Sequence, residues 1–360
     1  VTSMDSAAIR RLAETLVDYS TEVKKGQRVL IQGTDLARPL VEEIYRLALR
    51  RGAYPTANLQ FGSLNRIFFT EASDEQLDYL NPIQDFTTRN SDVLINILSS
   101  ENTRALTGVD PSRQQRFQRT MYPLQKYIME GNVRWCVAPF PTQAQAQDAG
   151  MSLDEYADFV FGATLIDWPA TVAMMEKVKS VFDAGDQVRL VGKETDLTFS
   201  IKGRPGIVDD GKYNMPGGEV FYAPLEKTVN GRILYEYPAI FGGREVSGIR
   251  LTFRDGKVVE ATAERGQDFL NKMLDTDEGA RYLGEFGIGT NFGIQKFTKN
   301  ILFDEKIGGT VHLAVGRAYD EGGGTNESAL HWDMVKEMRE GGEIHLNGKP
   351  VQKDGKFLFL

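Results

Sequence analysis

The sequence predicts an N-terminal α/β domain with a mostly parallel sheet, plus a mostly antiparallel α+β C-terminal domain. Three observations support this prediction. Apolar strands alternate with amphipathic helices up to about residue 185, whereas the later strands are short, alternate apolar with polar residues and are separated by glycines. The chain also has 360 residues, and a typical domain has about 150. We therefore expect two domains, residues 1–185 and residues 186–360.

In the first half, the spacing of apolar residues separates helices from strands. Ile9, Leu12 and Leu16 recur at the interval of one helix face. Residues 92–98 and 133–139 are almost wholly apolar, as in strands of a parallel sheet that helices cover on both faces. The same criteria predict helices at 6–23, 37–51, 113–127, 153–161 and 168–184, and strands at 28–32, 54–60, 92–98 and 133–139.

In the second half, a period of two residues replaces the helical period. The Asp-Gly pair at 255–256 is typical of a hairpin turn, and it joins two segments in which apolar and polar residues alternate. Similar turn sequences at 347–348 and 354–355 divide the end of the chain into a small meander. We expect a helix at 267–274 and strands at 188–191, 196–201, 246–253, 257–262, 343–346, 350–352 and 357–360.

The composition excludes several classes of protein. Lys and Arg total 42 against 50 Asp and Glu, so the formal charge is 42 − 50 = −8, whereas a general nucleic-acid binder needs a basic face. One cysteine cannot form an intrachain disulfide or a cysteine-rich zinc site. No apolar run approaches ~18 residues, the length of a membrane-spanning helix, and no signal peptide is visible. We expect a cytoplasmic protein without nucleic-acid or membrane partners.

Two features of the first half have simple structural interpretations. The loop at 33–35 follows a strand and precedes a helix, but it lacks the further glycines of a dinucleotide motif and the Lys-Ser/Thr pair of a P-loop. Cys136 lies inside an apolar strand, and no histidine occurs in this half to activate it. We therefore expect a plain βαβ connection and a buried, structural thiol.

Residues suited to catalysis or metal binding are concentrated in the second half, which contains all three histidines. On a strand, alternation would place His312 on the face opposite Val311 and Leu313. His331 and Asp333 would share one face of a strand and could bind one metal ion, but on a helix they would diverge by about 200°. The glycine-rich loop before them is compatible with either structure.

Two glutamates have unusual neighbours. Glu219 follows a flexible glycine turn and precedes an apolar strand, and Glu285 lies between glycines and apolar residues. A buried carboxylate is costly unless a cation pairs with it, and each glutamate alone would more often be an ion pair or a turn residue. Together with two histidines and an aspartate they form a ligand set that suits zinc, cobalt or manganese, and five ligands favour two ions. We expect the third histidine, His345, to be structural.

Four segments of the second half resemble one family of metallopeptidases. They are residues 213–221, 284–291, 312–319 and 331–334. In sequence and in order they are similar to the aminopeptidase T/aminopeptidase S family, also called thermophilic metalloproteases. The resemblance implies an N-terminal α/β domain, a C-terminal catalytic domain and a homodimer. The stretch between the third and fourth segments is shorter than in the founding enzymes.

The resemblance also implies an activity, that of a metal-dependent aminopeptidase that hydrolyses the N-terminal peptide bond of peptides with a free N-terminus. Two divalent ions would hold a bridging water and lower its pKa toward neutrality. Glu285 would act as general base, as metal ligand or as both, and Tyr319 would donate a hydrogen bond to the developing oxyanion. The metal ligands implied by the resemblance are Glu219, Glu285, His312, His331 and Asp333.

Two other functions are compatible with these residues. The same dinuclear site would suit a dipeptidase or an amidase that acts on small amides. A non-enzymatic α/β binding protein could instead hold one structural ion. Metal removal would then lower its stability, and no peptide would be cleaved. A structural zinc site is closed with four ligands, so five candidate ligands and a tyrosine favour the enzyme.

Overall fold

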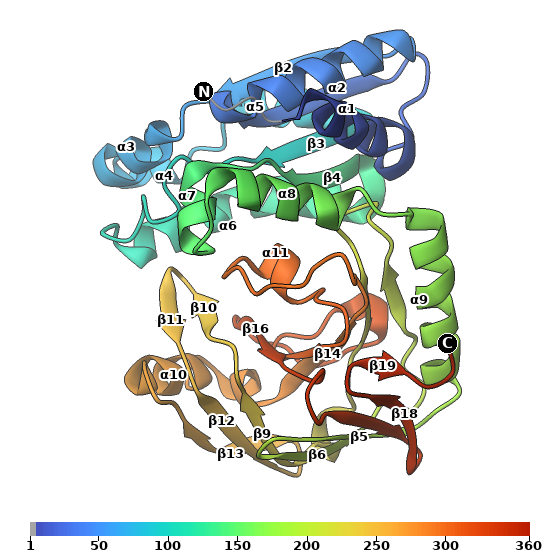
Figure 1. Ribbon diagram of the computed structural model, residues 1–360. Coiled ribbons are helices and arrows are strands. Elements are labelled where there is room, and N and C mark those ends of the chain that lie inside the picture. Colours follow the sequence, from blue (N-terminus) through green and yellow to red (C-terminus); the bar gives the residue numbers. More distant parts are fainter. Residues whose placement is uncertain (1–4) are drawn as a thin grey trace. The chain divides into compact units, whose positions relative to one another are not determined.

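The computed structural model describes residues 5–360, which form two compact units (Figure 1). The first unit runs to residue 165 and includes the segment 211–216, and the second unit contains the remainder. The predicted domain boundary after residue 185 stays a prediction. It differs from the division into compact units mainly at helix α9 (Trp168–Asp183), which lies before that boundary but belongs to the second unit. Among the described helices, none combines the length and apolar character that crossing a membrane requires.

The first unit is built on a parallel sheet, as predicted. Every pairing between neighbouring strands is parallel. Leu30 and Ile31 in the middle of the sheet, and Ile95 beside them, are almost completely buried, because helices cover the sheet. In spatial order the strands are β2 (Tyr54–Gln60), β1 (Arg28–Thr34), β3 (Val93–Leu98) and β4 (Arg134–Pro139).

The predicted helices of the first unit are present, with ends that differ by a few residues. Asp110 caps the helix that precedes β4, and Ser152 forms a capping box with Glu155 at the last helix of the unit. These helices are α1 (Ser6–Glu14), which a π-helical segment continues over Thr15–Ser20, α2 (Arg38–Arg50), α6 (Pro111–Tyr127) and α8 (Leu153–Thr164).

Several short helices were not predicted. They are α3 (Ser63–Glu71), α4 (Asp74–Leu77) and α5 (Pro82–Arg89) between β2 and β3, and α7 (Gln143–Asp148) after β4. α3 buries none of its side chains, and α5 buries only Thr88. These helices have only four to nine residues, fewer than the window of about 11 residues in which helical periodicity is read, so the pattern could not reveal them.

The second unit contains two larger antiparallel sheets with a hydrophobic core between them, and a small two-stranded one. Phe199 of one sheet and Phe286 of the other lie edge to face, with ring centroids 4.9 Å apart. We call the larger one the large sheet. Its strands, in spatial order, are β13 (Lys257–Thr262), β12 (Ile249–Arg254), β9 (Asn230–Tyr235), β6 (Thr195–Ser200), β5 (Gln187–Gly192), β17 (Glu343–Leu346), β18 (Lys349–Lys353) and β19 (Lys356–Phe357).

The other sheet of this unit, which we call the site sheet, carries all the candidate ligands. Helix α9 and helix α10 (Gln267–Leu274), both predicted, contribute buried residues to the same core. Two central strands of the site sheet are buried along their whole length, so both of their faces are covered. In spatial order the strands are β16 (His331–Lys336), β15 (Val311–Gly316), β14 (Leu283–Gly289), β8 (Glu219–Tyr222) and β7 (Ile207–Asp209).

The prediction of one strand over residues 246–253 is wrong. Gly248 has a φ of +64°, in the left-handed region, and it ends the extended backbone. A Cβ at this glycine would lie 2.5 Å from the Glu264 side chain, so the position also has no room for a larger residue unless that side chain moves. Before the glycine, β11 (Arg244–Val246) pairs with β10 (Ala239–Phe241), and after it β12 pairs with β9 and β13.

Candidate metal centre

The alternation of residues along two strands decides which face of the site sheet carries the candidate ligands. Leu313 of β15 belongs to the core between the sheets, so His312 lies on the other face. On β16, Trp332 joins the core, and its neighbours His331 and Asp333 therefore share the face of His312. The strand interpretation of this segment is confirmed, and the helical alternative is wrong.

The register of the site sheet brings the carboxylates beside these histidines. Ala314 of β15 is paired with Asp333 on one side and with Glu285 of β14 on the other. Glu219, the first residue of β8, is paired with Gly289, which lies four residues after Glu285 and hence on the same face. Four neighbouring strands therefore present the five predicted ligands to one place.

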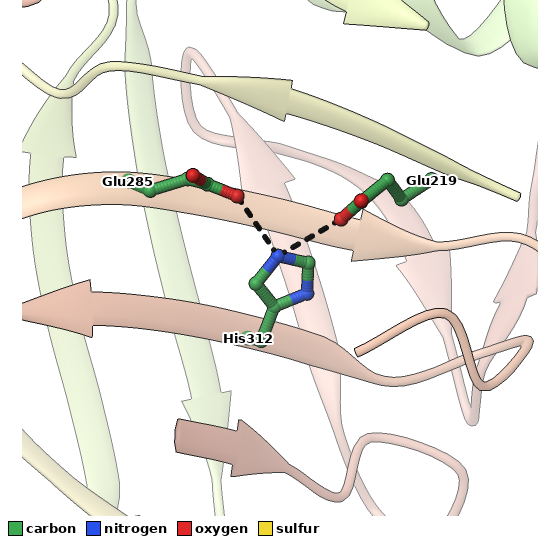
Figure 2. A group of neighbouring side chains, drawn as sticks. All are labelled: Glu219, Glu285 and His312. Atoms are coloured by element: carbon green, nitrogen blue, oxygen red, sulfur yellow. Dashed lines mark hydrogen bonds and ion pairs between the residues drawn. The ribbon is translucent and has the colours of Figure 1, made fainter. Parts of the chain in front are cut away.

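Figure 2 shows the imidazole of His312 between the carboxylates of Glu219 and Glu285. Nε2 of His312 lies 3.0 Å from Oε2 of Glu219 and 3.1 Å from Oε1 of Glu285. The imidazole is completely buried, and the two glutamate side chains are nearly so. One nitrogen and two oxygens, all within 4.8 Å of one another, form a first group that could hold a metal ion.

A second group contains His331, Asp333 and again Glu285. Nε2 of His331 lies 3.3 Å from Oδ2 of Asp333 and 3.8 Å from Oε2 of Glu285. Nδ1 of His331 lies 2.7 Å from the carbonyl oxygen of Arg317. A carbonyl can only accept, so Nδ1 carries a proton, and Nε2 is the nitrogen that is left to bind a metal ion. The two oxygens of Glu285 thus face one histidine each.

A glycine makes room for the buried histidine. Gly287 of β14 is paired directly with His312 of β15. A Cβ at Gly287 would lie 1.9 Å from Cε1 and 2.0 Å from Nε2 of His312, so the imidazole occupies the space that any larger residue would need. This requirement for a glycine was not predicted, because it depends on the register between β14 and β15.

Several polar atoms of the cluster have no partner among the described residues. Oε2 of Glu285, Oδ1 of Asp333 and Nδ1 of His312 are buried and form no hydrogen bond within residues 5–360. Burying such groups, and gathering several carboxylates in one place, is costly without cations. Carboxylate oxygens and imidazole nitrogens are ligands that suit zinc, cobalt and manganese. The residues present therefore fit a divalent metal.

The contacts within the cluster shift the pKa values of its members. Burial disfavours the imidazolium of His312, but Glu219 and Glu285 raise its pKa well above the usual value. Burial likewise opposes protonation of His331, yet Asp333 and then Glu285 raise its pKa to about 9. Burial raises the pKa of Glu285, and the nearby Asp333 adds to this effect. Without a metal the cluster thus retains protons that a divalent cation would displace.

Two charged residues beside the cluster were not predicted, Glu305 and Lys306, which follow α11 (Ile301–Asp304). The Lys306 side chain is completely buried; its Nζ lies 3.4 Å from Oε1 of Glu219 and 3.6 Å from Oδ2 of Asp209, and it contacts Oε1 of Glu305. Burial lowers the pKa of Lys306, but these carboxylates raise it well above the usual value. In the sequence they form an ordinary charged pair, so no signal identified them.

Tyr319, the predicted catalytic tyrosine, lies beside the second group. Its ring centroid is 4.9 Å from that of His331 and 6.2 Å from that of Phe221. Burial, and then the negative charge of Glu285, raise the pKa of Tyr319 above its usual value. Its hydroxyl therefore stays protonated at neutral pH and can donate a hydrogen bond.

Two predicted structural residues lie outside this cluster. Cys136 is buried on β4, as expected. His345 lies on β17 of the large sheet, where its Nε2 is 2.8 Å from Oε2 of Glu343. An ion pair between neighbouring residues of one strand is a common arrangement at a protein surface. His345 is therefore not part of the candidate centre.

The comparisons with known proteins agree with this geometry. The family model described as thermophilic metalloprotease (M29) matches residues 5–357. Aminopeptidase AmpS of Bacillus subtilis is 27% identical and the match covers 98% of this chain and 99% of the relative. Aminopeptidase T of Thermus thermophilus is 29% identical, with 91% of each chain covered. The solved structure of wild-type AmpT from Thermus thermophilus superposes with a TM-score of 0.85 at 26% identity, covering 98% of this chain and 99% of that one.

The family model spans nearly the whole described chain, including both compact units and every candidate ligand. The fold is that of AmpT, with a parallel sheet followed by antiparallel sheets. The family description also implies a divalent metal, which the donor set of the cluster fits. The chain belongs to the thermophilic metalloprotease (M29) family, and it is thus an enzyme that hydrolyses peptide bonds.

Proposed function

We propose that this enzyme is an aminopeptidase that removes the N-terminal residue of peptides with a free N-terminus, using two divalent metal ions. One observation carries the proposal. Among the described residues three groups of side chains could hold a metal ion, and the two that together contain all five predicted ligands share Glu285, whose two oxygens face His312 and His331. Glu219 completes the first group and Asp333 the second. The relatives named aminopeptidases support the choice of substrate.

The charge of the cluster also favours bound cations. Glu219, Glu285 and Asp333 carry three formal negative charges on one largely buried face, and the positive charge of Lys306 beside Glu219 does not offset them all. Buried unpaired charge is costly, so divalent cations would stabilise the cluster. Zinc, cobalt and manganese all accept this donor set.

The chain's own residues would share the work of catalysis. Divalent ions, when bound, polarise the scissile carbonyl and lower the pKa of a water molecule toward neutrality. The position of Glu285 between the two histidines favours a ligand role, and a role as general base would require one of its oxygens to turn toward the water. Tyr319 would donate a hydrogen bond to the oxyanion that develops at the carbonyl. The Arg317 carbonyl would keep a proton of His331 on Nδ1 and so orient Nε2 toward a metal ion.

Turnover of an aminoacyl anilide, before and after removal of metal, tests the proposal. We expect hydrolysis of leucyl p-nitroanilide that is lost on exhaustive chelation and returns when zinc, cobalt or manganese is added. N-acetyl-leucyl p-nitroanilide should resist hydrolysis. Activity that survives complete metal removal, or equal turnover of the blocked substrate, would contradict the proposal. A panel of dipeptides and longer peptides separates an aminopeptidase, which cleaves both, from a dipeptidase.

We propose further that the enzyme is a homodimer, as the family resemblance implies, and that it is cytoplasmic, as the sequence led us to expect. The dimer can be tested separately by sedimentation equilibrium of the purified chain. A monomer at micromolar concentration would contradict this part of the proposal and leave the assignment of the reaction intact.

A further inference from the structure

We propose that Glu305 receives the α-ammonium group of the substrate and so makes the site selective for a free N-terminus. This inference rests on the proposed aminopeptidase function and deepens it. An exopeptidase of this kind must recognise a positive charge close to the scissile bond, because the amine nitrogen and the carbonyl carbon are separated by a single Cα. The group that binds the amine must therefore border the metal ligands.

Glu305 borders the metal ligands in this way. It directly follows α11, and one of its carboxylate oxygens is within 4.8 Å of ligand atoms of both His312 and Asp333. Its side chain is 17% exposed, whereas those of Lys306 and His312 have no exposed surface. Glu305 is thus a carboxylate that borders both the ligands and solvent.

Glu305 shares its neighbouring cation with other carboxylates. Nζ of Lys306 contacts Glu305 and lies 3.4 Å from Oε1 of Glu219 and 3.6 Å from Oδ2 of Asp209, so Lys306 is not reserved for Glu305. Burial raises the pKa of Glu305 to about 8, and the ammonium of Lys306 opposes this rise. A second cation beside Glu305, such as a substrate ammonium, would likewise favour the carboxylate. Lys306 itself cannot meet the substrate, because it is completely buried.

The contact with Lys306 leaves room for a second ammonium at Glu305. Its Oε1 already accepts a hydrogen bond from the ammonium of Lys306. A carboxylate can accept about four hydrogen bonds and an ammonium donates three, so a second ammonium can share Glu305.

The variant Glu305→Gln provides the test, with Glu337→Gln as the matched control. The amide side chain of the variant keeps the volume and the acceptor for Lys306 but loses the charge. Glu337 lies in the same compact unit, its side chain is also 17% exposed, and its partners Arg339 and Tyr237 are not part of the metal centre. Each protein would be loaded with zinc, and its metal content measured by atomic emission.

The kinetic measurement compares leucyl p-nitroanilide with its des-amino counterpart, 4-methylpentanoyl p-nitroanilide. Loss of a hydrogen bond to a charged group is worth about a 10- to 100-fold change. We expect Glu305→Gln to lower kcat/KM for the leucyl substrate by this factor, chiefly through KM, with unchanged turnover of the des-amino substrate. Calorimetry with 3-methylbutylamine on the zinc-loaded proteins should show a weakening of similar size. Wild type and Glu337→Gln should agree in both measurements.

The possible outcomes are distinguishable. Fewer bound zinc ions in Glu305→Gln than in Glu337→Gln would make Glu305 a metal ligand and overturn the inference. Unchanged selectivity and unchanged amine affinity would overturn it as well. If the wild type cleaves no aminoacyl anilide, the proposed function fails instead. Should Glu305→Gln not fold, Glu305→Asp keeps the charge but withdraws it, and a normal KM for the leucyl substrate in that variant would contradict the inference.

Discussion

The two histidines of the candidate metal centre are held by different means. His312 has no exposed surface, and its imidazole fills the space above Gly287. His331 is 21% exposed, and a hydrogen bond from Nδ1 to the carbonyl of Arg317 fixes its orientation. Tight packing thus adds to the carboxylate contacts that place the first histidine, whereas a backbone hydrogen bond adds to those that place the second. The buried half of the centre is suited to holding a metal ion firmly, and the more open half is suited to meeting a substrate.

The charged residues around the two halves of the centre also differ. Lys306 stands behind Glu219 in the buried half, where it offsets carboxylate charge that no solvent reaches. The open half has Tyr319 beside His331 and no lysine or arginine side chain within 4.0 Å of Asp333 among the described residues. A permanent cation therefore organises one half, and a neutral hydrogen-bond donor borders the other. Glu285 connects them and should be the most sensitive position.

The largest expected effect is that of Glu285→Gln, because this change alters both halves. The amide keeps one oxygen but loses the charge that both metal groups use. We expect kcat for leucyl p-nitroanilide to fall by about 10³-fold or more, together with weaker metal binding. Urea unfolding of the metal-free protein should change little. Near-normal kcat would contradict the shared role of Glu285.

The next largest effect is expected from Tyr319→Phe, which changes only the open half. Removing one donor to an oxyanion typically lowers kcat by about 10²- to 10³-fold. Metal content and thermal stability should match the wild type, because the ring and its contact with His331 remain. Steady-state kinetics and metal analysis on the same preparation measure both quantities. A fall in metal content would mean that Tyr319 supports the ligands instead.

The pH dependence of stability distinguishes the metal-free from the metal-loaded centre. Burial opposes protonation of His331, but Asp333 raises its folded pKa to about 9, compared with 6.5 for the free side chain. The protonated imidazole of His331 therefore stabilises the folded state fully below pH 6.5, and this stabilisation is lost as the pH rises through 9. We expect the unfolding free energy of the metal-free protein to fall by about 3 kcal/mol over this range.

Urea titrations at pH 6 and pH 9.5 measure this difference. His331→Gln should reduce the decline, since one titrating imidazole is gone and only His312 remains in the cluster. The zinc-loaded wild type should not show the same decline, because metal binding requires the neutral imidazole. An unfolding free energy of the metal-free wild type that rises with pH would contradict the ion pairs described here.

The smallest expected effect is that of Gly287→Ala, which acts on the buried half through packing. The added Cβ would overlap the His312 ring, so either the imidazole or β14 must move. We expect a loss of about 1–3 kcal/mol in stability and weaker binding of one metal ion. Gly162→Ala is the matched control, since a Cβ there meets nothing within 4 Å. Equal stability of the two variants would show that His312 has room to move.

The sequence was sufficient to predict the fold class and the face that carries the ligands. Residues at i and i+2 of a strand share a face, so His331 and Asp333 could be grouped before their strand was known to exist. The same alternation assigned Leu313 to the core and His312 to the opposite face. These patterns are local, and a single strand is enough to display them.

The features that escaped prediction depend on contacts between distant segments. Lys306 is far in sequence from Asp209 and Glu219, and only the folded chain brings them together. The role of Gly287 depends on its register with β15, which no local pattern reveals. The catalytic and metal-binding roles of the predicted residues stay predictions, although the structure brings them together.

The number of metal ions per chain tests the central claim most directly. The purified protein would be stripped of metal, dialysed against zinc, cobalt or manganese and analysed by atomic emission against protein concentration. We predict two ions per chain in the wild type, and fewer than two in Glu285→Gln, whose side chain both metal groups share. A wild type that binds one ion or none with each of these metals, while it still cleaves leucyl p-nitroanilide, would contradict the dinuclear centre.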